Sequence, residues 1–216
     1  MIILFYLIWL ILGLVVGLFI HNLSTFLIIK RAGEVENNIL LSAKYSAQGF
    51  AVLNGSIWLG TILAFGLNPL TVEFLIMLSI CTTLSVVDIS IRKIPNEILL
   101  LLLASSLAFL LVNNEFGNIS NRLIGTVVGI IVFLLPTLIG KGAGAGDIKL
   151  AGVIGFCLGL HDMLEAYIFM IIPLLIYTAY IYITKKGSIK TKVALGSFMS
   201  VGFIMVFVVR LFGLGF

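Results

Sequence analysis

Two aspartates in this sequence each adjoin a strongly apolar run and a turn of unusual composition. Asp88 closes one run before a basic turn and Pro95, and Asp147 follows the glycine-rich stretch 140–146. Two carboxyl groups within hydrogen-bond reach share a proton, because both cannot easily ionise so close together. The ionised group can take a proton from water while the protonated group donates to a peptide carbonyl. Such a pair would hydrolyse an amide without a covalent intermediate, and it would titrate as a unit.

The glycines before Asp147 would suit an extended substrate. Gly144 and Gly146 carry no Cβ, so another backbone could approach closely or pair beside them as an added strand. A flexible loop at a helix start explains the same glycines. The stretch matches neither nucleotide-binding glycine pattern, because Gly142 and Lys149 stand where those patterns require other residues. Lys149 could stabilise charge near Asp147, or extend to lipid headgroups.

The composition is that of a membrane protein. The 216 residues are 61% hydrophobic and 10% charged, whereas soluble domains carry about 25% charged residues. A membrane-crossing helix needs about 20 apolar residues. The candidate spans are 2–23, 48–66, 70–87, 95–113, 122–140, 148–160, 164–184 and 193–214. We therefore predict one all-α domain over 1–216, a polytopic membrane bundle of about eight transmembrane helices.

The basic residues predict how this bundle is oriented. Of the thirteen Lys and Arg residues, all but Arg122 and Arg210 fall in the connections after the first, third, fifth and seventh spans. The positive-inside rule places these connections in the cytoplasm and both termini outside. Asp88 and Asp147 would then lie at the cytoplasmic ends of their helices. No basic residue precedes 2–23, so we expect this span to be retained rather than cleaved as a signal peptide.

The segment 24–47 is the longest cytoplasmic connection. Its mixture of apolar and charged residues fits an interfacial amphipathic helix, a helical hairpin or a solvated loop. The net charge of +4 indicates contact with the lipid bilayer rather than nucleic acid, because the cations stand between apolar spans. Cys81 and Cys157 lie inside apolar runs without a histidine cluster, so we expect neither a metal site nor a disulfide.

Around both aspartates the sequence resembles the type IV prepilin peptidases, which are membrane aspartic proteases of the Gly-x-Gly-Asp class. In that family one aspartate shortly precedes an Ile-Pro-Asn or Ile-Pro-Asp turn, as Asp88 precedes 94–96 here. The second aspartate follows Gly-x-Gly and precedes a lysine, as Asp147 does. The resemblance extends from about Tyr45 to the end of the chain. It implies catalytic roles for both aspartates, and binding or loop roles for Gly144, Gly146, Lys149, Pro95 and Asn96.

The resemblance also implies a substrate and a location. The substrate would be a prepilin or pseudopilin precursor with a basic leader, cut after a glycine at the cytoplasmic face of the cell membrane. Many family members carry a cytoplasmic insert with two Cys-x-x-Cys pairs and methylate the new N-terminus with S-adenosylmethionine. This chain lacks those cysteines and its 24–47 segment is short. We expect proteolysis to need no cofactor, and S-adenosylmethionine to bind only if methylation is retained.

Other interpretations use the same residues. A transporter or proton relay could use the carboxylates, but would require charges along the middle of the bundle. A non-catalytic membrane scaffold leaves the paired motifs unexplained. Presenilin-like proteases place a tyrosine before the first aspartate, whereas Val87 stands there in this chain. An archaeal preflagellin peptidase shares both motifs and stays an alternative.

Overall fold

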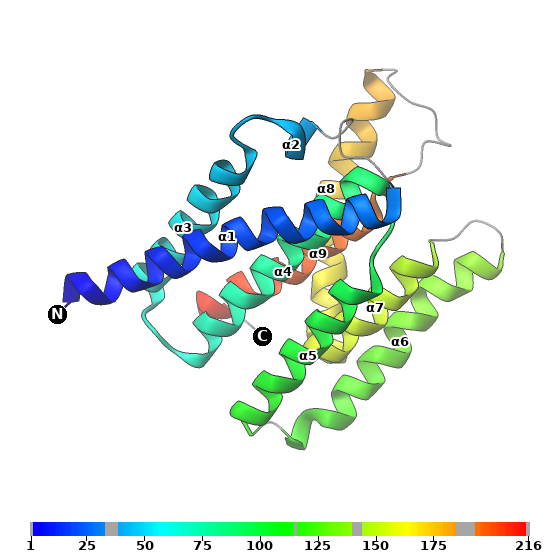
Figure 1. Ribbon diagram of the computed structural model, residues 1–216. Coiled ribbons are helices and arrows are strands. Elements are labelled where there is room, and N and C mark those ends of the chain that lie inside the picture. The colour runs from blue at the N-terminus through cyan, green and yellow to red at the C-terminus, as the bar shows by residue number, and fades with distance from the viewer. Residues whose placement is uncertain (1, 33–38, 115, 140–143, 185–192, 215–216) are drawn as a thin grey trace.

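The described part of the chain is almost entirely helical. The computed structural model describes residues 2–32, 39–114, 116–139, 144–184 and 193–214. No strand occurs among these residues, so the all-α prediction is confirmed (Figure 1). The helices are α1 (Ile2–Ala32), α2 (Ile39–Ser42), α3 (Ser46–Phe65), α4 (Pro69–Ile91), α5 (Asn96–Val112), α6 (Ile119–Leu138), α7 (Ala145–Leu158), α8 (Leu160–Ile183) and α9 (Leu195–Leu211), with a 3₁₀ turn, η1 (Phe116–Asn118), before α6.

Each predicted span coincides with one helix, although the ends differ. By length and composition, α1, α3, α4, α8 and the stretch Phe116–Leu138 around α6 could each cross a membrane, while α5 and α9 are shorter apolar helices. α7 has 14 residues and is about 21 Å long, against about 30 Å for the hydrocarbon core. The five long apolar helices among the described residues confirm the prediction of a membrane helix bundle. Because α5, α7 and α9 are shorter, the number of membrane crossings stays a prediction.

Residues 24–32 are a continuation of the first helix. α1 runs without a break to Ala32, and it buries Ser24, Leu27 and Ile28 against the bundle. α2 is a single short turn, and Ser46 at the start of α3 lies 2.8 Å from Nε2 of His21. The rest of the predicted connection, 33–38, lies outside the described residues.

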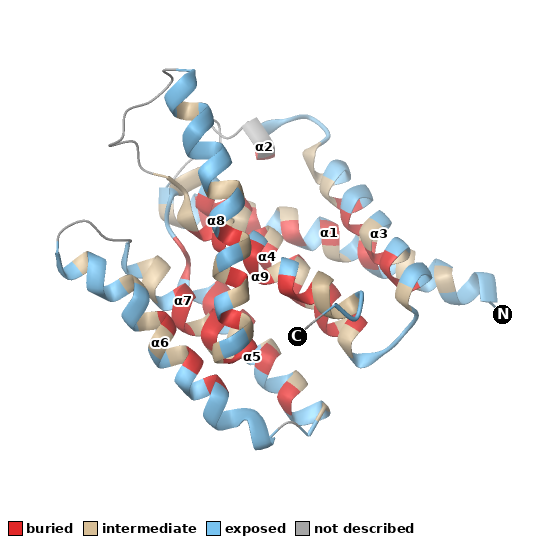
Figure 2. Ribbon diagram, turned by 180° about the vertical axis from the view of Figure 1, so that it is seen from behind, coloured by how far each residue is buried: buried red, intermediate tan, exposed pale blue. Residues whose placement is uncertain are grey.

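α4 is the central helix of the bundle. In the most apolar 18-residue stretch of α4, 61% of the residues are buried, whereas in the corresponding stretches of the other candidate spans between 11% and 33% are buried. Figure 2 shows buried residues along the inward faces of the helices and exposed residues along the outward faces. Many of the exposed residues are large and apolar, including Leu100, Ile168 and Ile176. A soluble protein rarely exposes such extensive apolar surface, so these faces are suited to lipid.

Small residues bring the helices into close contact. A Cβ added to Gly125 of α6 would lie 2.5 Å from the carbonyl oxygen of Gly155 in α7, and one added to Gly17 of α1 would lie 2.5 Å from that of Phe50 in α3. Membrane helices pack through small residues in this way, because backbones can then approach closely. The contact with α6 fixes the position of α7, which carries Asp147.

The C-terminal end of α7 lies inside the bundle. Arg122 of α6 is 8% exposed and donates hydrogen bonds to the carbonyl oxygens of Cys157 (2.8 Å) and Phe156 (3.4 Å), and to the hydroxyl of Ser106 (3.2 Å). The last carbonyls of a helix have no partner within it and need one from elsewhere when water is excluded. Arg122 therefore caps the short helix that positions Asp147.

Candidate active site

Asp88 lies in the last turn of α4 and is 3% exposed. Its Oδ2 accepts a hydrogen bond of 3.0 Å from the backbone N–H of Ser197, in the first turn of α9. The first N–H groups of a helix lack intrahelical partners and carry partial positive charge. Asp88 therefore caps α9 from a different helix, and the N-terminus of α9 favours the ionised carboxylate.

Asp147 lies in the first turn of α7 and is partly buried. Its Oδ2 accepts a hydrogen bond of 2.9 Å from the N–H of Gly144, the residue before the helix. Burial raises the pKa of the Asp147 carboxyl group, and the Gly144 N–H opposes this shift. Each aspartate therefore accepts a hydrogen bond from the backbone at a helix N-terminus, Asp88 at the start of α9 and Asp147 at the start of its own helix, α7.

The turn between α4 and α5 brings the two aspartates to the same region. Arg92 ends α4 in the left-handed conformation, with φ 51° and ψ 39°, and its N–H donates to the carbonyl oxygen of Asp88 at 2.8 Å. Pro95 then takes an extended conformation as the N-cap of α5, just before Asn96. Its missing N–H costs little, since helix starts leave such groups unpaired. The sequence had indicated Pro95 as the first residue of that span.

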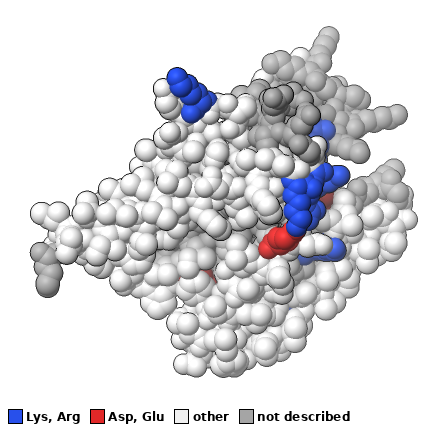
Figure 3. All heavy atoms as spheres, viewed as in Figure 1, with Lys and Arg blue, Asp and Glu red and all other residues white. Residues whose placement is uncertain are grey.

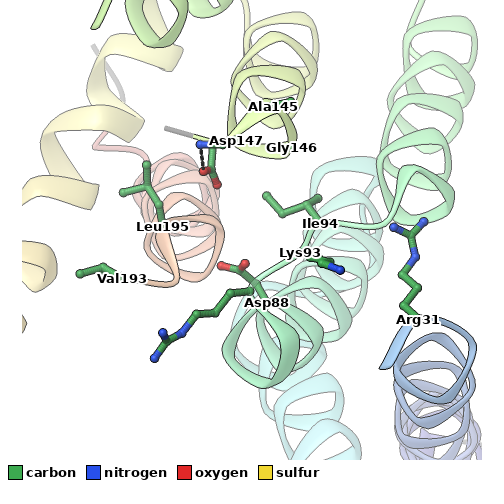
Figure 4. Close-up of a pocket in the computed structure, with 11 residues that line it drawn as sticks. Arg31, Asp88, Lys93, Ile94, Ala145, Gly146, Asp147, Val193 and Leu195 are labelled. Atoms are coloured by element: carbon green, nitrogen blue, oxygen red, sulfur yellow. Dashed lines mark hydrogen bonds between the residues drawn. The ribbon is translucent and has the colours of Figure 1, made fainter. Parts of the chain in front are cut away.

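A cavity of about 320 Å³ lies between these elements and is lined by both aspartates. The close-up in Figure 4 shows the carboxyl groups of Asp88 and Asp147 directed into one space, with Leu195 and Ile94 on either side. The other lining residues are Arg31, Arg92, Lys93, Gly144, Ala145, Gly146 and Val193. Two acids, a basic rim and an apolar wall therefore meet at one site.

The two glycines at this cavity differ in their surroundings. A Cβ on Gly146 would lie 3.1 Å from the Cβ of Ile94, whereas a Cβ on Gly144 would have only the Asp147 Oδ2 nearby, at 3.4 Å. Gly146 thus lets the start of α7 approach the turn that follows Asp88. Gly144 contributes its N–H to Asp147 and leaves the wall beside it open.

Some residues singled out in the sequence do not line the cavity. Lys149 is exposed and donates a hydrogen bond of 3.2 Å to Oδ1 of Asn96, which joins α7 to α5. Lys149, Asn96 and Pro95 are absent from the cavity wall described above. The glycine-rich residues 140–143 lie outside the described part of the chain.

Sequence reasoning missed the contributions of α1 and α9. Arg31 reaches the cavity because α1 continues beyond the predicted span. Glu97 of α5 holds this end of α1 through Arg31 Nη2 at 2.7 Å and Lys30 Nζ at 3.0 Å. On α9, the backbone N–H of Ser197 contacts Asp88 next to Gly196 at the helix start, and nothing in the sequence signalled this contact.

Charged residues gather at the end of the bundle where the cavity lies. Figure 3 shows a group of basic side chains with acidic ones beside them, on a face that is otherwise mostly uncharged. Lys30, Arg31, Arg92 and Lys93 all adjoin the cavity or its immediate surroundings. Within the described ranges, no three His, Cys, Asp or Glu side chains come together in a way that could hold a metal ion.

The helices and the cavity define a membrane helix bundle that holds two carboxyl groups at one end. The chain belongs to the type IV leader peptidase family, whose model matches residues 75–182, half of the chain and including both aspartates. It is also similar to the "Prepilin leader peptidase/N-methyltransferase" of Bacillus subtilis (strain 168), with 28% identity over 123 residues, 56% of this chain and 49% of the relative. The match thus covers about half the length of that relative. No solved structure matches the chain.

Proposed function

We propose that this protein is a membrane aspartic endopeptidase that removes the leader peptide of type IV prepilins or pseudopilins. The observation that carries the proposal is the single cavity lined by Asp88 and Asp147, each anchored through Oδ2 to the N-terminus of a different helix. Membership of the type IV leader peptidase family and the name of the Bacillus subtilis relative support the substrate class.

In the proposed reaction the two aspartates share one proton. The ionised carboxylate takes a proton from water as the water oxygen bonds to the scissile carbonyl carbon, and the protonated partner gives its proton to the carbonyl oxygen. In the second step a proton passes to the amide nitrogen and the C–N bond breaks. The products are a leader with a new carboxyl group and a mature chain with a new amine. The open wall at Gly144 and the volume of the cavity suit an extended peptide.

The proposed location is the cytoplasmic face of the cell membrane. The cavity lies at the bundle end that carries Lys30, Arg31, Arg92 and Lys93, and positive residues favour the cytoplasmic side. A substrate with an apolar helix in the bilayer and a basic leader would present its cleavage site at this boundary. The two partners are therefore the precursor and the lipid bilayer.

The first test is cleavage of a co-expressed prepilin by Asp88→Asn and Asp147→Asn variants. Each variant should lose at least about 10³-fold in cleavage rate, because an amide can neither hold the negative charge nor exchange the shared proton. Gel mobility and the N-terminal mass of the product report cleavage. The matched control is Asp162→Asn, since Asp162 pairs with Arg210 of α9 and does not line the cavity; it should cleave normally. Near-normal activity in either Asp88→Asn or Asp147→Asn would contradict the two-aspartate mechanism.

The same mass measurement tests methylation. The Bacillus subtilis relative is named as both a leader peptidase and an N-methyltransferase. S-adenosylmethionine is expected as a cofactor here only if that second activity is retained, and a methylated mature N-terminus would show it. An archaeal preflagellin supplied in the same assay tests the alternative substrate.

A further inference from the structure

The first turn of α9 forms part of the wall around Asp88. Ala194, at the N-cap position, gives the helix no side-chain cap, whereas the N–H of Ser197 is occupied by Oδ2 of Asp88 at 3.0 Å. This hydrogen bond joins α4 and α9, and its two residues are 109 positions apart in the sequence. The carboxyl group and the helix start therefore hold one another in place.

This contact depends on the absence of a side chain at Gly196. A Cβ built on Gly196 would lie 2.9 Å from Oδ2 and 3.2 Å from Cγ of Asp88, and 2.8 Å from Cδ1 of Ile94. Something must move to admit a methyl group at these distances. The atoms that would have to move are the ends of the Ile94 and Asp88 side chains, which can shift at little energetic cost. A shift of the Asp88 side chain, however, displaces its carboxyl group.

We propose that Gly196 is a positioning residue for Asp88, and that the start of α9 is a third component of the active site beside the end of α4 and the start of α7. The inference rests on the proposed peptidase function. Without a Cβ at this position, α9 approaches closely enough for the Ser197 N–H to fix one carboxylate oxygen. The other oxygen is thereby aimed at a water molecule and the substrate carbonyl in the cavity.

Gly202 provides a matched comparison on the same helix. A Cβ on Gly202 would run into the backbone carbonyl oxygen of Ala166 in α8 and would lie 3.0 Å from both Cβ and N of Met170. A backbone cannot give way as a side-chain end can, so this substitution costs stability. Gly202 stands about 9 Å further along the helix than Gly196, and none of the atoms nearest to its added Cβ belongs to Asp88. An alanine at Gly202 therefore tests helix packing alone, whereas an alanine at Gly196 tests the position of the Asp88 carboxyl group.

The kinetic test compares Gly196→Ala with Gly202→Ala in the full chain, purified in detergent with a prepilin substrate. Gly196→Ala should melt close to wild type and lower kcat at least about 10-fold with KM changed by less than about 3-fold, because small misplacements of a catalytic group are costly. Gly202→Ala should melt at a lower temperature, and its kcat and KM per folded molecule should match wild type. A merely structural role of Gly196 would give both variants the same behaviour.

A second measurement needs no substrate. Carbodiimides modify protonated carboxyl groups, and peptide mass spectrometry can quantify the adduct at Asp88. The other charged groups around the cavity are Asp147, Arg31, Arg92 and Lys93, and they are the same in both variants. Loss of the Ser197 N–H removes a donor that favours the ionised carboxylate. At neutral pH, Asp88 should therefore be modified several-fold more in Gly196→Ala than in wild type or in Gly202→Ala.

The outcomes separate the two proposals. If wild type cleaves no prepilin but labelling of Asp88 rises only in Gly196→Ala, the proposed substrate is wrong and the positioning role stands. If wild type cleaves and Gly196→Ala keeps a normal kcat and normal labelling, the positioning role is wrong and the peptidase stands. A raised KM with unchanged kcat in Gly196→Ala would also overturn it, because that result indicates substrate binding instead.

Discussion

At Asp147, burial and a hydrogen bond act in opposite directions on one carboxyl group. Burial raises the pKa of Asp147 above its ordinary value of 3.8, and the N–H of Gly144 only partly offsets this. The proposed mechanism needs one ionised carboxylate in the pair. As the pH falls through the raised pKa of Asp147, both carboxyl groups of the pair become protonated and activity is lost. At high pH the shared proton is lost, so the profile has two limbs that belong to the pair.

We therefore predict that kcat/KM begins to fall above pH 3.8 on the acid side, because burial raises the pKa of Asp147. The measurement is a pH–rate profile with a prepilin substrate in detergent, with circular dichroism at each pH to confirm that the helices persist. Full activity down to about pH 4, where an exposed aspartate is still about half ionised, would show that burial does not govern the pair.

The two glycines of the Gly-x-Gly-Asp stretch should respond unequally to alanine. A Cβ on Gly146 lies 3.1 Å from Ile94, so the turn after Asp88 must shift by a few tenths of an ångström, whereas Gly144 has room. We expect Gly146→Ala to lower kcat/KM by about 10-fold and Gly144→Ala to lower it by less than about 3-fold. Initial cleavage rates at equal enzyme abundance provide the measurement. Equal losses would mean that both glycines act through substrate contact and not through helix approach.

At the scale of helices, the sequence predicted which segments form helices better than it predicted where each helix ends. Apolar length located a helix for each predicted span, because burial in lipid demands it. The same criterion ended the first span at 23, although α1 continues to Ala32, where Arg31 and Lys30 meet Glu97. That pairing is a tertiary contact between α1 and α5. A single sequence carries no record of it.

The sequence indicated the two aspartates of the site and the glycines before Asp147, but not the contribution of α9. Asp88 and Asp147 could be singled out because a carboxylate beside an apolar run is costly and therefore noticeable. The role of α9 could not, because its donor is the backbone N–H of Ser197 and its enabling feature is the missing Cβ of Gly196. Neither feature has a chemical signature in the sequence until the fold brings α9 to α4.

The contact of α6 with α7 should be intolerant of any added methyl group. A Cβ on Gly155 would collide with the backbone at Gly125, while one on Gly60 of α3 meets nothing within 4 Å. Gly155→Ala should reduce stability by about 1–3 kcal/mol through overpacking. Gly60→Ala should leave stability unchanged or raise it by up to about 1 kcal/mol, since alanine favours the helix. Thermal melting in detergent checks both, and equal melting temperatures would contradict the close packing.

At the scale of the whole molecule, charge distribution predicts orientation. Single cysteines at Lys44 and Asn118 would stand at exposed positions near opposite ends of the predicted spans, and the native Cys81 and Cys157 are buried. We expect a membrane-impermeant maleimide to label Asn118→Cys in intact cells and Lys44→Cys only after permeabilisation. The wild-type chain supplies the background. The reverse labelling pattern would place the cavity outside the cell.

The short helix that carries Asp147 has a consequence for the surrounding lipid. α7 is about 21 Å long and ends at carbonyls capped by Arg122 within the bundle, whereas the hydrocarbon core of a bilayer is about 30 Å thick. We therefore expect the contacts of α7 with its neighbours to set the depth of Asp147 in the bilayer. Where a protein presents less apolar length than the bilayer, the bilayer thins or the protein tilts. We therefore expect acyl-chain length in the host membrane to change how readily water reaches Asp88 and Asp147.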